Sequence, residues 1–280
     1  MNKKFIKWGM IASAGMFLFD ALILEKYFFE VNVFEIGKRG TGKKVKLLLL
    51  TDLHLGKRLS PSYEKLAGKV NEIDPDLILI AGDLVDEFGT FAPALKFFNL
   101  LNKSIPKVGI MGNHDHKSEV SLLEFKQLYA ENNGTLLMNE STAFSFGGNR
   151  IMVTGLDDFI EGDADFSKAV KDVGREENHI LLIHSPKQQE KVLKKTKKIN
   201  ADRSEDRQLD IQYIFAGHNH GGQVRILGYA PVMPEKSGKY MNGWYNNKPP
   251  YLYVSKGFGT STLPFRFCAR SEVTVFNFGV

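Results

Sequence analysis

The chain has 280 residues, of which 43% are hydrophobic, and this is enough to bury the core of a single domain. Its formal net charge of +5 favours an anionic partner, such as a phosphate compound or an acidic membrane surface, without identifying one. The single cysteine, Cys268, excludes an internal disulfide and any zinc site built from cysteines.

The amino-terminal segment differs from the rest of the chain. Three lysines precede an apolar stretch, Trp8–Leu24, that only Asp20 interrupts. It could be a cleaved signal peptide, a membrane anchor, a helix lying in the membrane interface, or an amphipathic helix packed on the domain. The stretch is short for a span, and no small-residue cleavage site follows it. We expect residues 1–30 to form an uncleaved anchor or interfacial helix at the cell membrane, on a face that the flanking lysines leave undecided.

Short apolar runs alternate with segments of helical periodicity along the remaining residues, 31–280. This alternation is typical of an α/β fold. We expect strands at Val45–Thr51, Leu77–Ala81, Lys107–Met111, Leu136–Phe146, Ile151–Thr154, Ile180–Ile183, Ile211–Ala216, Tyr251–Val254 and Glu272–Phe278. We expect helices at Ser62–Ile73, Thr90–Leu101 and Ser118–Glu131. The charge-dense stretch Lys187–Arg207 is either a solvated helix and loop or a basic patch that faces an anionic surface.

Five of the apolar runs are followed at once by side chains of the kind that bind metals. Strand ends at one edge of a sheet converge, so we expect these side chains to meet in one site. They are Asp52, His54, Asp83, Asn113, His114, His184, His218 and His220. Five of the seven histidines fall here, which structural histidines scattered through a core would not do. The other two, His116 and His179, are expected to be structural or exposed.

The donor atoms in this set are imidazole nitrogens and carboxylate or amide oxygens, without a thiolate. Such a set suits Mn²⁺, Fe or Zn²⁺ better than Ca²⁺. With His114 set aside, the candidates are more than one ion with an open position needs. They suit two ions about 3.5–4 Å apart that share a carboxylate. Asp83 stands alone at its strand end and offers two oxygens, so we expect it to bridge the ions. Of the three metals we expect Mn²⁺, with Zn²⁺ and Fe as alternatives.

The same motifs, in this order, resemble the signature of the calcineurin-like metallophosphoesterase superfamily. They are Asp52-Leu53-His54, Gly82-Asp83, Gly112-Asn113-His114-Asp115, His184 and Gly217-His218-Asn219-His220. The match runs from about Val45 to the end of the chain. Two later stretches, 221–224 and 253–261, resemble a membrane-linked bacterial phosphodiesterase branch, which is similar to one type of UDP-2,3-diacylglucosamine pyrophosphatase. Asn219 and Ser271 stand where this branch usually has Thr and Pro.

The resemblance implies a four-layer α/β/β/α sandwich of two mixed sheets and a role for each site residue. One ion would be held by Asp52, His54, Asp83 and His220, and the other by Asp83, Asn113, His184 and His218. Asn113 and His114 would contact the substrate phosphate, and His114 would protonate the leaving oxygen. Asp115 would orient His114, or equally cap a turn. Arg58 would bind a second phosphate, or simply lie on the surface.

Residues 31–280 are therefore expected to form a catalytic domain that cleaves a phosphodiester or pyrophosphate bond by attack of metal-bound hydroxide. One alternative is the UDP-2,3-diacylglucosamine pyrophosphatase of lipid A synthesis, and another is a non-catalytic, membrane-bound metal-binding scaffold. The intact Asn113-His114 pair favours an enzyme. We expect a phosphoester substrate, which could be lipid-linked, contact with a membrane through residues 1–30, and a monomer. No interleaved basic and aromatic run indicates a nucleic-acid partner.

Overall fold

The computed structural model describes residues 28–38, 40 and 42–280, together with the single positions 8, 15 and 25. The anchor or interfacial helix predicted for residues 1–30 therefore lies almost entirely outside the described residues. Within the described part of the chain, no helix combines the length and the apolar character needed to cross a membrane.

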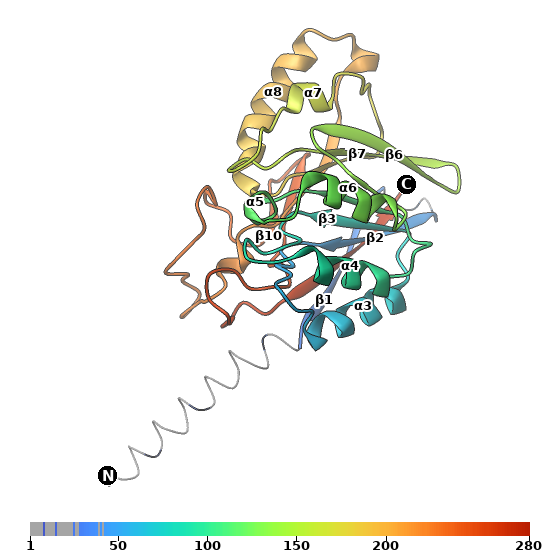
Figure 1. Ribbon diagram of the computed structural model, residues 1–280. Helices are drawn as coiled ribbons and strands as arrows, with labels where there is room; N and C mark the ends of the chain where they lie inside the picture. The colour runs from blue at the N-terminus through green and yellow to red at the C-terminus, as the bar shows by residue number, and fades with distance from the viewer. Residues whose placement is uncertain (1–7, 9–14, 16–24, 26–27, 39, 41) are drawn as a thin grey trace.

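Two six-stranded sheets form the centre of the described chain (Figure 1). The first has the order β1-β12-β2-β3-β4-β5, and the second has the order β10-β11-β9-β8-β7-β6. The strands of the first sheet are β1 (Glu30–Gly37), β2 (Lys44–Leu50), β3 (Leu77–Ala81), β4 (Lys107–Ile110), β5 (Gly134–Leu136) and β12 (Glu272–Gly279). Those of the second are β6 (Glu140–Phe146), β7 (Asn149–Gly155), β8 (His179–Leu182), β9 (Ile211–Ala216), β10 (Gly243–Tyr245) and β11 (Tyr251–Val254). Both sheets are mixed, because β12 runs antiparallel to β2 and β6 antiparallel to β7.

The central strands are apolar on both faces because each sheet is covered on both sides. Along β2, Leu47 and Leu49 pack toward the second sheet, whereas Leu48 and Leu50 pack toward helices, as the alternation of side chains along a strand requires. Between the sheets, the ring of Phe215 stacks on that of Phe276 with centroids 4.3 Å apart. The core between the sheets thus fixes the two sheets against each other.

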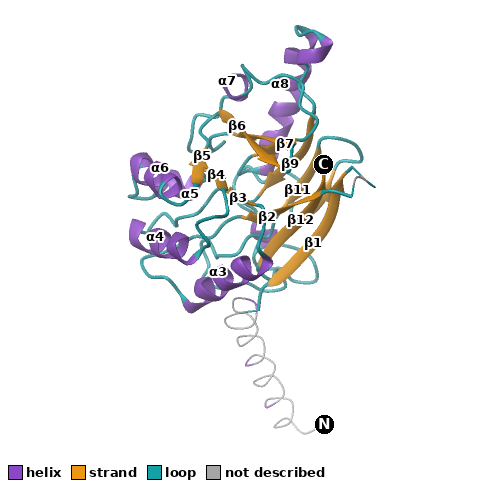
Figure 2. Cartoon of the chain, turned by 90° about the vertical axis from the view of Figure 1, so that its right-hand side faces the viewer, coloured by secondary structure: helices purple, strands orange, loops and turns teal. Residues whose placement is uncertain are grey.

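Helices cover the outer face of each sheet. On the first sheet lie α3 (Pro61–Ile73), α4 (Phe91–Leu100) and α6 (Leu122–Ala130), which Figure 2 shows together on one side of the strands. On the second lie α7 (Phe166–Ala169) and α8 (Gln189–Ala201). The short elements α5 (Asn113–Lys117), η2 (Pro186–Gln188), η3 (Glu205–Arg207) and η4 (His220–Gly222) lie between the larger ones. The layers are helix, sheet, sheet and helix, so the predicted four-layer sandwich is confirmed.

Four strands differ from the sequence prediction in more than their bounds. The predicted strand Leu136–Phe146 is two strands, β5 and β6, in different sheets, and Asn139 with a φ of 59° breaks it between them. β1 was not predicted, because its polar residues interrupt any apolar run, yet it pairs with β12 along its whole length. β10 was not predicted either, because its three residues are too few to show an apolar run or an alternation of apolar and polar residues.

Candidate metal centre

The predicted ligands lie on loops that follow β2, β3, β4, β8 and β9, at the carboxyl ends of these strands. Five of the seven have a positive φ, which residues other than glycine rarely adopt. They are Asp52 (52°), His54 (44°), Asp83 (52°), His218 (73°) and His220 (49°). Strained backbone of this kind persists only where the surrounding structure holds it, and it clusters at functional sites.

Two glycines allow these loops to approach each other. A Cβ atom on Gly217 would clash with Oδ2 of Asp52, and a Cβ atom on Gly112 would clash with Oδ1 of Asp83. Glycine alone lets a backbone pass this close to a carboxylate. The glycines of the sequence motifs therefore serve the packing of the ligand loops.

Donor atoms of the described residues gather in three groups, one of which joins His54 to Asp86 and His114, and the predicted ligands make up the other two. Atoms of Asp52, His54 and His220 lie within 4.8 Å of one another, as do atoms of Asp83, His184 and His218. The groups meet at Asp83, whose Oδ2 is 3.4 Å from Nε2 of His54 and 3.1 Å from Nε2 of His184. One carboxylate oxygen thus faces imidazoles of both groups.

Several buried donor atoms of the predicted ligands lack a hydrogen bond. They are Oδ2 of Asp52, Oδ1 of Asn113 and Nε2 of His184. Leaving a buried polar atom unsatisfied costs about 1–3 kcal/mol, so three of them among the predicted ligands need an explanation. Metal ions explain them, because carboxylate and amide oxygens and imidazole nitrogens are metal donors. The residues present therefore fit a metal centre.

His184 and His218 each donate a hydrogen bond from one ring nitrogen to a backbone carbonyl, and this leaves the other ring nitrogen free to bind a metal. Nδ1 of His184 donates to the carbonyl oxygen of Ala81 at 2.9 Å, which leaves the lone pair on Nε2. Nε2 of His218 donates to the carbonyl oxygen of Glu235 at 2.7 Å, which leaves the lone pair on Nδ1. Such bonds fix the tautomer of an imidazole ligand and make it a better donor.

His220 is held differently, by the fully buried Arg266. Nη2 of Arg266 lies 3.2 Å from Nδ1 of His220, and since arginine only donates, Nδ1 accepts. A neutral His220 then carries its proton on Nε2, which is 3.1 Å from Nε2 of His54. An ion bound at Nε2 would have to displace this proton. Burial lowers the pKa of Arg266 to about 10, so the guanidinium remains charged at neutral pH. It also donates to the carbonyls of His220, Lys256, Gly259 and Ala269.

His114 stands beside the donor atoms, and Asp86 faces its ring. The ring centroids of His114 and His54 are 4.5 Å apart. Oδ2 of Asp86 is 3.7 Å from Nδ1 of His114 and 3.3 Å from Nδ1 of His54, while Nε2 of His114 faces Oγ of Ser261 at 3.4 Å. Burial lowers the pKa of His114. Asp86 was not among the predicted site residues, although its place three residues after Asp83 was the available signal.

Asp115 has a structural role. Its carboxylate accepts the N–H groups of Leu84 at 3.2 Å, Val85 at 2.8 Å and Gly112 at 2.9 Å, which ties together the loops after β3 and β4. Burial and then the charge of Asp83 raise the pKa of Asp115 to about 7. This is the capping role that the sequence allowed, and none of these three hydrogen bonds involves the ring of His114.

A cavity of about 460 Å³ opens beside the ligands and is bounded in part by Asp83, Asn113, His114, His218 and His220. Much of the remaining lining is apolar. It comprises Ile160, Val224, Pro231, Val232, Pro234 and Leu263. Lys117 is the one lysine or arginine among the described residues that line this cavity. Arg58 is exposed and does not line it. The prediction that Arg58 binds a second phosphate therefore gains no support from the cavity.

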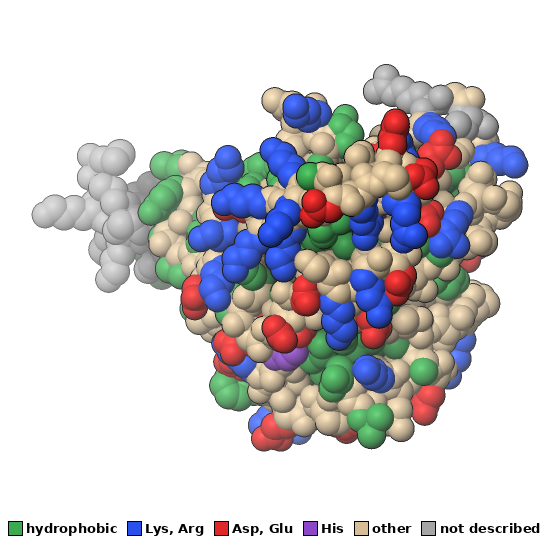
Figure 3. All heavy atoms as spheres, turned by 90° about the horizontal axis from the view of Figure 1, so that it is seen from above, with side chains coloured by type: hydrophobic (Ala, Val, Ile, Leu, Met, Phe, Trp, Pro, Cys, Tyr) green, Lys and Arg blue, Asp and Glu red, His purple; other side chains and the backbone are tan. Residues whose placement is uncertain are grey.

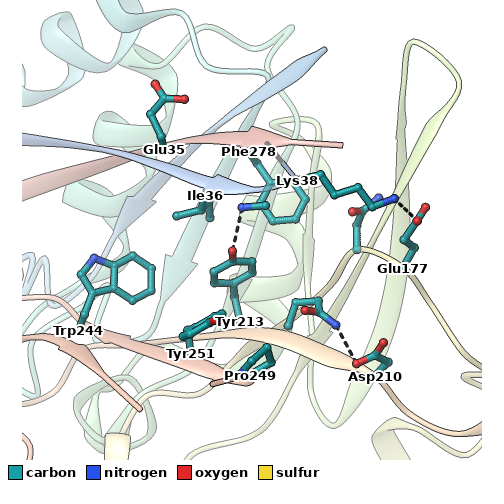
Figure 4. A pocket seen from close by; sticks show the side chains of 13 residues that line it. Glu35, Ile36, Lys38, Glu177, Asp210, Tyr213, Trp244, Pro249, Tyr251 and Phe278 are labelled. Carbon is teal, nitrogen blue, oxygen red and sulfur yellow. Dashed lines mark hydrogen bonds and ion pairs between the residues drawn. The ribbon is translucent and has the colours of Figure 1, made fainter. Parts of the chain in front are cut away.

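A second cavity, of about 640 Å³, lies away from the ligands, beside the start of β9 and the end of β1 (Figure 4). The hydroxyl of Tyr213 accepts the N–H of Gly37 at 2.8 Å, and Lys38 pairs with Glu177 across the opening. None of the metal-type clusters found among the described residues falls here. The smaller cavity is thus the one that carries reactive groups.

Comparison with known proteins gives the same answer as this geometry. The profile of the calcineurin-like phosphoesterase family matches residues 45–222, a range that includes every predicted ligand. The chain is 30% identical over 237 residues to "uncharacterized metallophosphoesterase YkuE" of Bacillus subtilis (strain 168), across 82% of the chain and 78% of that protein. It is also 30% identical over 242 residues to an "uncharacterized metallophosphoesterase" of Helicobacter pylori, across 82% of the chain and 59% of that protein.

Among solved structures, TT1561 of Thermus thermophilus superposes with a TM-score of 0.45 at 13% identity, across 77% of this chain and 91% of that one. The family match is the stronger finding, because it spans more than half of the chain and includes the strand ends where the donor atoms meet. The chain belongs to the calcineurin-like phosphoesterase family and is a metal-dependent hydrolase of phosphoester bonds.

Proposed function

We propose that the protein cleaves a phosphodiester or pyrophosphate bond with two divalent metal ions that share Asp83. The observation that carries the proposal is the position of this carboxylate, with Oδ2 within 3.4 Å of imidazoles from both donor groups. Mn²⁺ is the proposed metal, with Zn²⁺ and Fe as alternatives, because all three accept mixed nitrogen and oxygen donors.

The residues divide into two ligand sets and a proton donor. Asp52, His54, Asp83 and His220 would hold one ion, and Asp83, Asn113, His184 and His218 the other. Such ions supply positive charge to the phosphoryl oxygens and lower the pKa of water when they are bound. His114 faces the cavity with its Nδ1 toward Asp86, so its Nε2 can give a proton to the leaving oxygen. Asn113 contributes an amide to the substrate phosphate.

The lining of the cavity supports a diester or pyrophosphate over a monoester. A monoester dianion concentrates its charge at the phosphate, so it favours a site with several lysine or arginine side chains. The described lining of this cavity offers one, Lys117. The apolar part of the lining suits a bulky second substituent on the phosphate. We therefore propose that the apolar lining contacts either the leaving group or the organic substituent that stays on the phosphate.

The same lining supports a lipid-linked substrate, and we propose that the protein acts as a monomer at the cell membrane. The apolar stretch Trp8–Leu24 with its preceding lysines supports attachment to that membrane. UDP-2,3-diacylglucosamine, which combines a pyrophosphate with acyl chains, is the specific candidate that the resemblance of residues 253–261 favours. A nucleic acid is not proposed as a partner.

A reconstitution experiment tests this function. Enzyme stripped of metal by a chelator is supplied with Mn²⁺, Zn²⁺ or Fe²⁺ and assayed on bis(p-nitrophenyl) phosphate, p-nitrophenyl phosphate and UDP-2,3-diacylglucosamine. We expect Mn²⁺ to restore hydrolysis, with two ions per chain and a higher rate on the diester than on the monoester. Faster monoester hydrolysis would overturn the diester preference. Two bound ions without hydrolysis of any substrate would favour a metal-binding scaffold.

A further inference from the structure

A hairpin of exposed apolar residues projects from the edge of the catalytic cavity. We call residues 224–232 the rim hairpin. At its turn Ile226 is 59% exposed, Leu227 is 103% exposed and Tyr229 is 70% exposed. Single exposed apolar residues are common, but adjacent large ones on one projection usually mark a surface that binds something.

The turn does not require an apolar side chain at its tip. Ile226 and Tyr229 exchange two backbone hydrogen bonds of 2.9 and 3.0 Å, and the two residues between them have positive φ, Leu227 at 50° and Gly228 at 83°. Turns with two positive φ values strongly prefer Asn-Gly or Asp-Gly. Leucine is unfavourable there for the turn and gains nothing from burial, so its presence indicates an apolar environment outside the chain.

The base of the rim hairpin is firmly attached. The N–H of Arg225 donates to the carbonyl of Phe267 at 2.8 Å, and its Nε donates to the carbonyl of Cys268 at 2.7 Å. Residues of the base, Val224 and Val232, line the catalytic cavity. The apolar surface therefore continues from the metal ligands to the tip.

Basic residues lie close to this apolar projection along the chain. Between residues 224 and 240, Arg225, Lys236 and Lys239 stand against one acidic residue, Glu235. Lys236 lies over the ring of Phe159 at 5.3 Å, as does Lys191 of α8 at 4.4 Å, so the basic face of α8 continues into this region. Figure 3, which looks onto the α8 side of the molecule, shows Lys and Arg side chains gathered there.

We propose that the rim hairpin inserts into an anionic lipid bilayer. Ile226, Leu227 and Tyr229 enter the acyl region, and Lys191, Lys236 and Lys239 lie at the negatively charged headgroups. Apolar tips flanked by lysines suit such a surface, because burial of the tip and attraction to anionic lipids act together. This inference deepens the proposed function and rests on it for the identity of the substrate. The acyl chain of a lipid-linked substrate would pass from the bilayer along Val224 and Val232 to the metal ligands.

An environment-sensitive fluorophore at the tip tests the insertion. In the full chain with Cys268→Ser, Leu227→Cys is labelled and mixed with phosphatidylcholine vesicles that contain about one third phosphatidylglycerol. The control is Leu123→Cys, which is 66% exposed on α6. We expect a blue shift and a gain in intensity at position 227 alone, both reduced by Lys191→Glu with Lys239→Glu. No change at 227, an equal change at 123, or an equal response to pure phosphatidylcholine would overturn the proposal.

An activity measurement separates this inference from the proposed function. The double variant Ile226→Ser with Leu227→Ser should match the wild type on a soluble diester, because neither residue lines the cavity. On a diester embedded in anionic vesicles, its rate should fall at least about fivefold as the apolar area of the tip is removed. Equal rates on vesicles would overturn the role of the rim hairpin. If the wild type hydrolyses neither diester, the proposed function fails, while the fluorophore still decides on insertion.

Discussion

Oδ2 of Asp83 lies 3.1 Å from Nε2 of His184 and 3.4 Å from Nε2 of His54, so one oxygen faces imidazoles of both donor groups. Burial opposes its charge, but His184 and then His54 hold the pKa of Asp83 well below its ordinary value. We predict that Asp83→Ala loses both ions, whereas His218→Ala loses one. Mass spectrometry of the metal content of purified variants measures this.

Asp83→Asn is the matched control, because Oδ1 of Asp83 also accepts the N–H of His114 at 2.8 Å. The amide can keep that hydrogen bond while it removes the charge. Circular dichroism should show a folded protein, and the metal content should still fall to near zero. Two ions per chain in Asp83→Ala would show that Asp83 is no bridge.

His114 is expected to act on the leaving group and not on the metals. We predict that His114→Ala keeps both ions but loses about 10²–10⁴-fold in turnover, the usual contribution of a general acid. The loss should be smaller on nitrophenyl diesters than on alkyl diesters, since nitrophenolate leaves without a proton. An equal loss on both substrates would rule out the acid role.

Asp86 should matter because it faces two rings, at 3.3 Å from Nδ1 of His54 and 3.7 Å from Nδ1 of His114. We predict that Asp86→Asn lowers kcat/KM by about 10–100-fold, as loss of a residue behind a metal ligand typically does. The neighbouring Glu87→Gln is the control and should stay within about twofold of the wild type. Steady-state kinetics on a soluble diester distinguishes them, and equal effects would refute the positioning role.

The pair His116 and Asp157, 2.6 Å apart, should make stability depend on pH. Asp157 raises the pKa of His116, so the stabilisation by His116 is complete below pH about 6.5 and is lost as the pH rises through the raised value. Burial opposes ionisation of Asp157, but His116 lowers its pKa, so its stabilisation is complete above pH about 3.9 and is lost in acid. The pair therefore stabilises the fold most between these limits.

We predict that His116→Gln lowers the free energy of unfolding by about 1 kcal/mol at pH 5.5 and has little effect at pH 8.5. That difference corresponds to a change in Tm of about 2–4 °C. Lys96→Gln is the control: it breaks the exposed pair with Glu64, and its effect on Tm should be the same at both pH values. Parallel shifts of Tm at the two pH values for His116→Gln would contradict the assignment.

Much of the fold was predictable because the central strands are covered on both faces. β3 and β11 appear in the sequence as continuous apolar runs and β9 as a run that only Gln212 interrupts, and their predicted bounds agree with the structure. The donor residues were predictable for a related reason, since each follows such a run and loops at one sheet edge must meet. Edge strand β1 lacked this signal, because Glu30, Asn32 and Glu35 interrupt its apolar residues.

Contacts between distant residues could not be predicted. Arg266 reaches the backbone of four loop residues, but nothing in its neighbourhood along the chain marks it as buried. Asp86 and Asp115 are both near metal-type motifs, and only the folded loops show which one faces His114. The rim hairpin carries no sequence motif. Its apolar residues are notable only because the fold leaves them exposed.

The amino-terminal segment gives the last prediction, which depends on β1. A chain that begins at residue 28 keeps β1, its pairing with β12, and the ion pair of 2.6 Å between Glu30 and Lys256. A chain that begins at residue 40 loses all three and also the contact of Phe29 with Phe258. Burial of one such ring is worth about 1.5–3 kcal/mol, so we predict a fall in Tm of at least about 6 °C for the shorter chain alone.

The chain that begins at residue 28 tests the membrane anchor. It should melt like the full chain, hydrolyse a soluble diester at the same rate, and lose most of its binding to vesicles in flotation assays. Any binding that remains should disappear at high salt, since lysines beside the rim hairpin would supply it and salt screens their attraction to anionic lipids. If the chain instead melts at a lower temperature and loses activity on soluble and vesicle substrates alike, residues 1–27 stabilise the domain, and the anchor hypothesis is wrong.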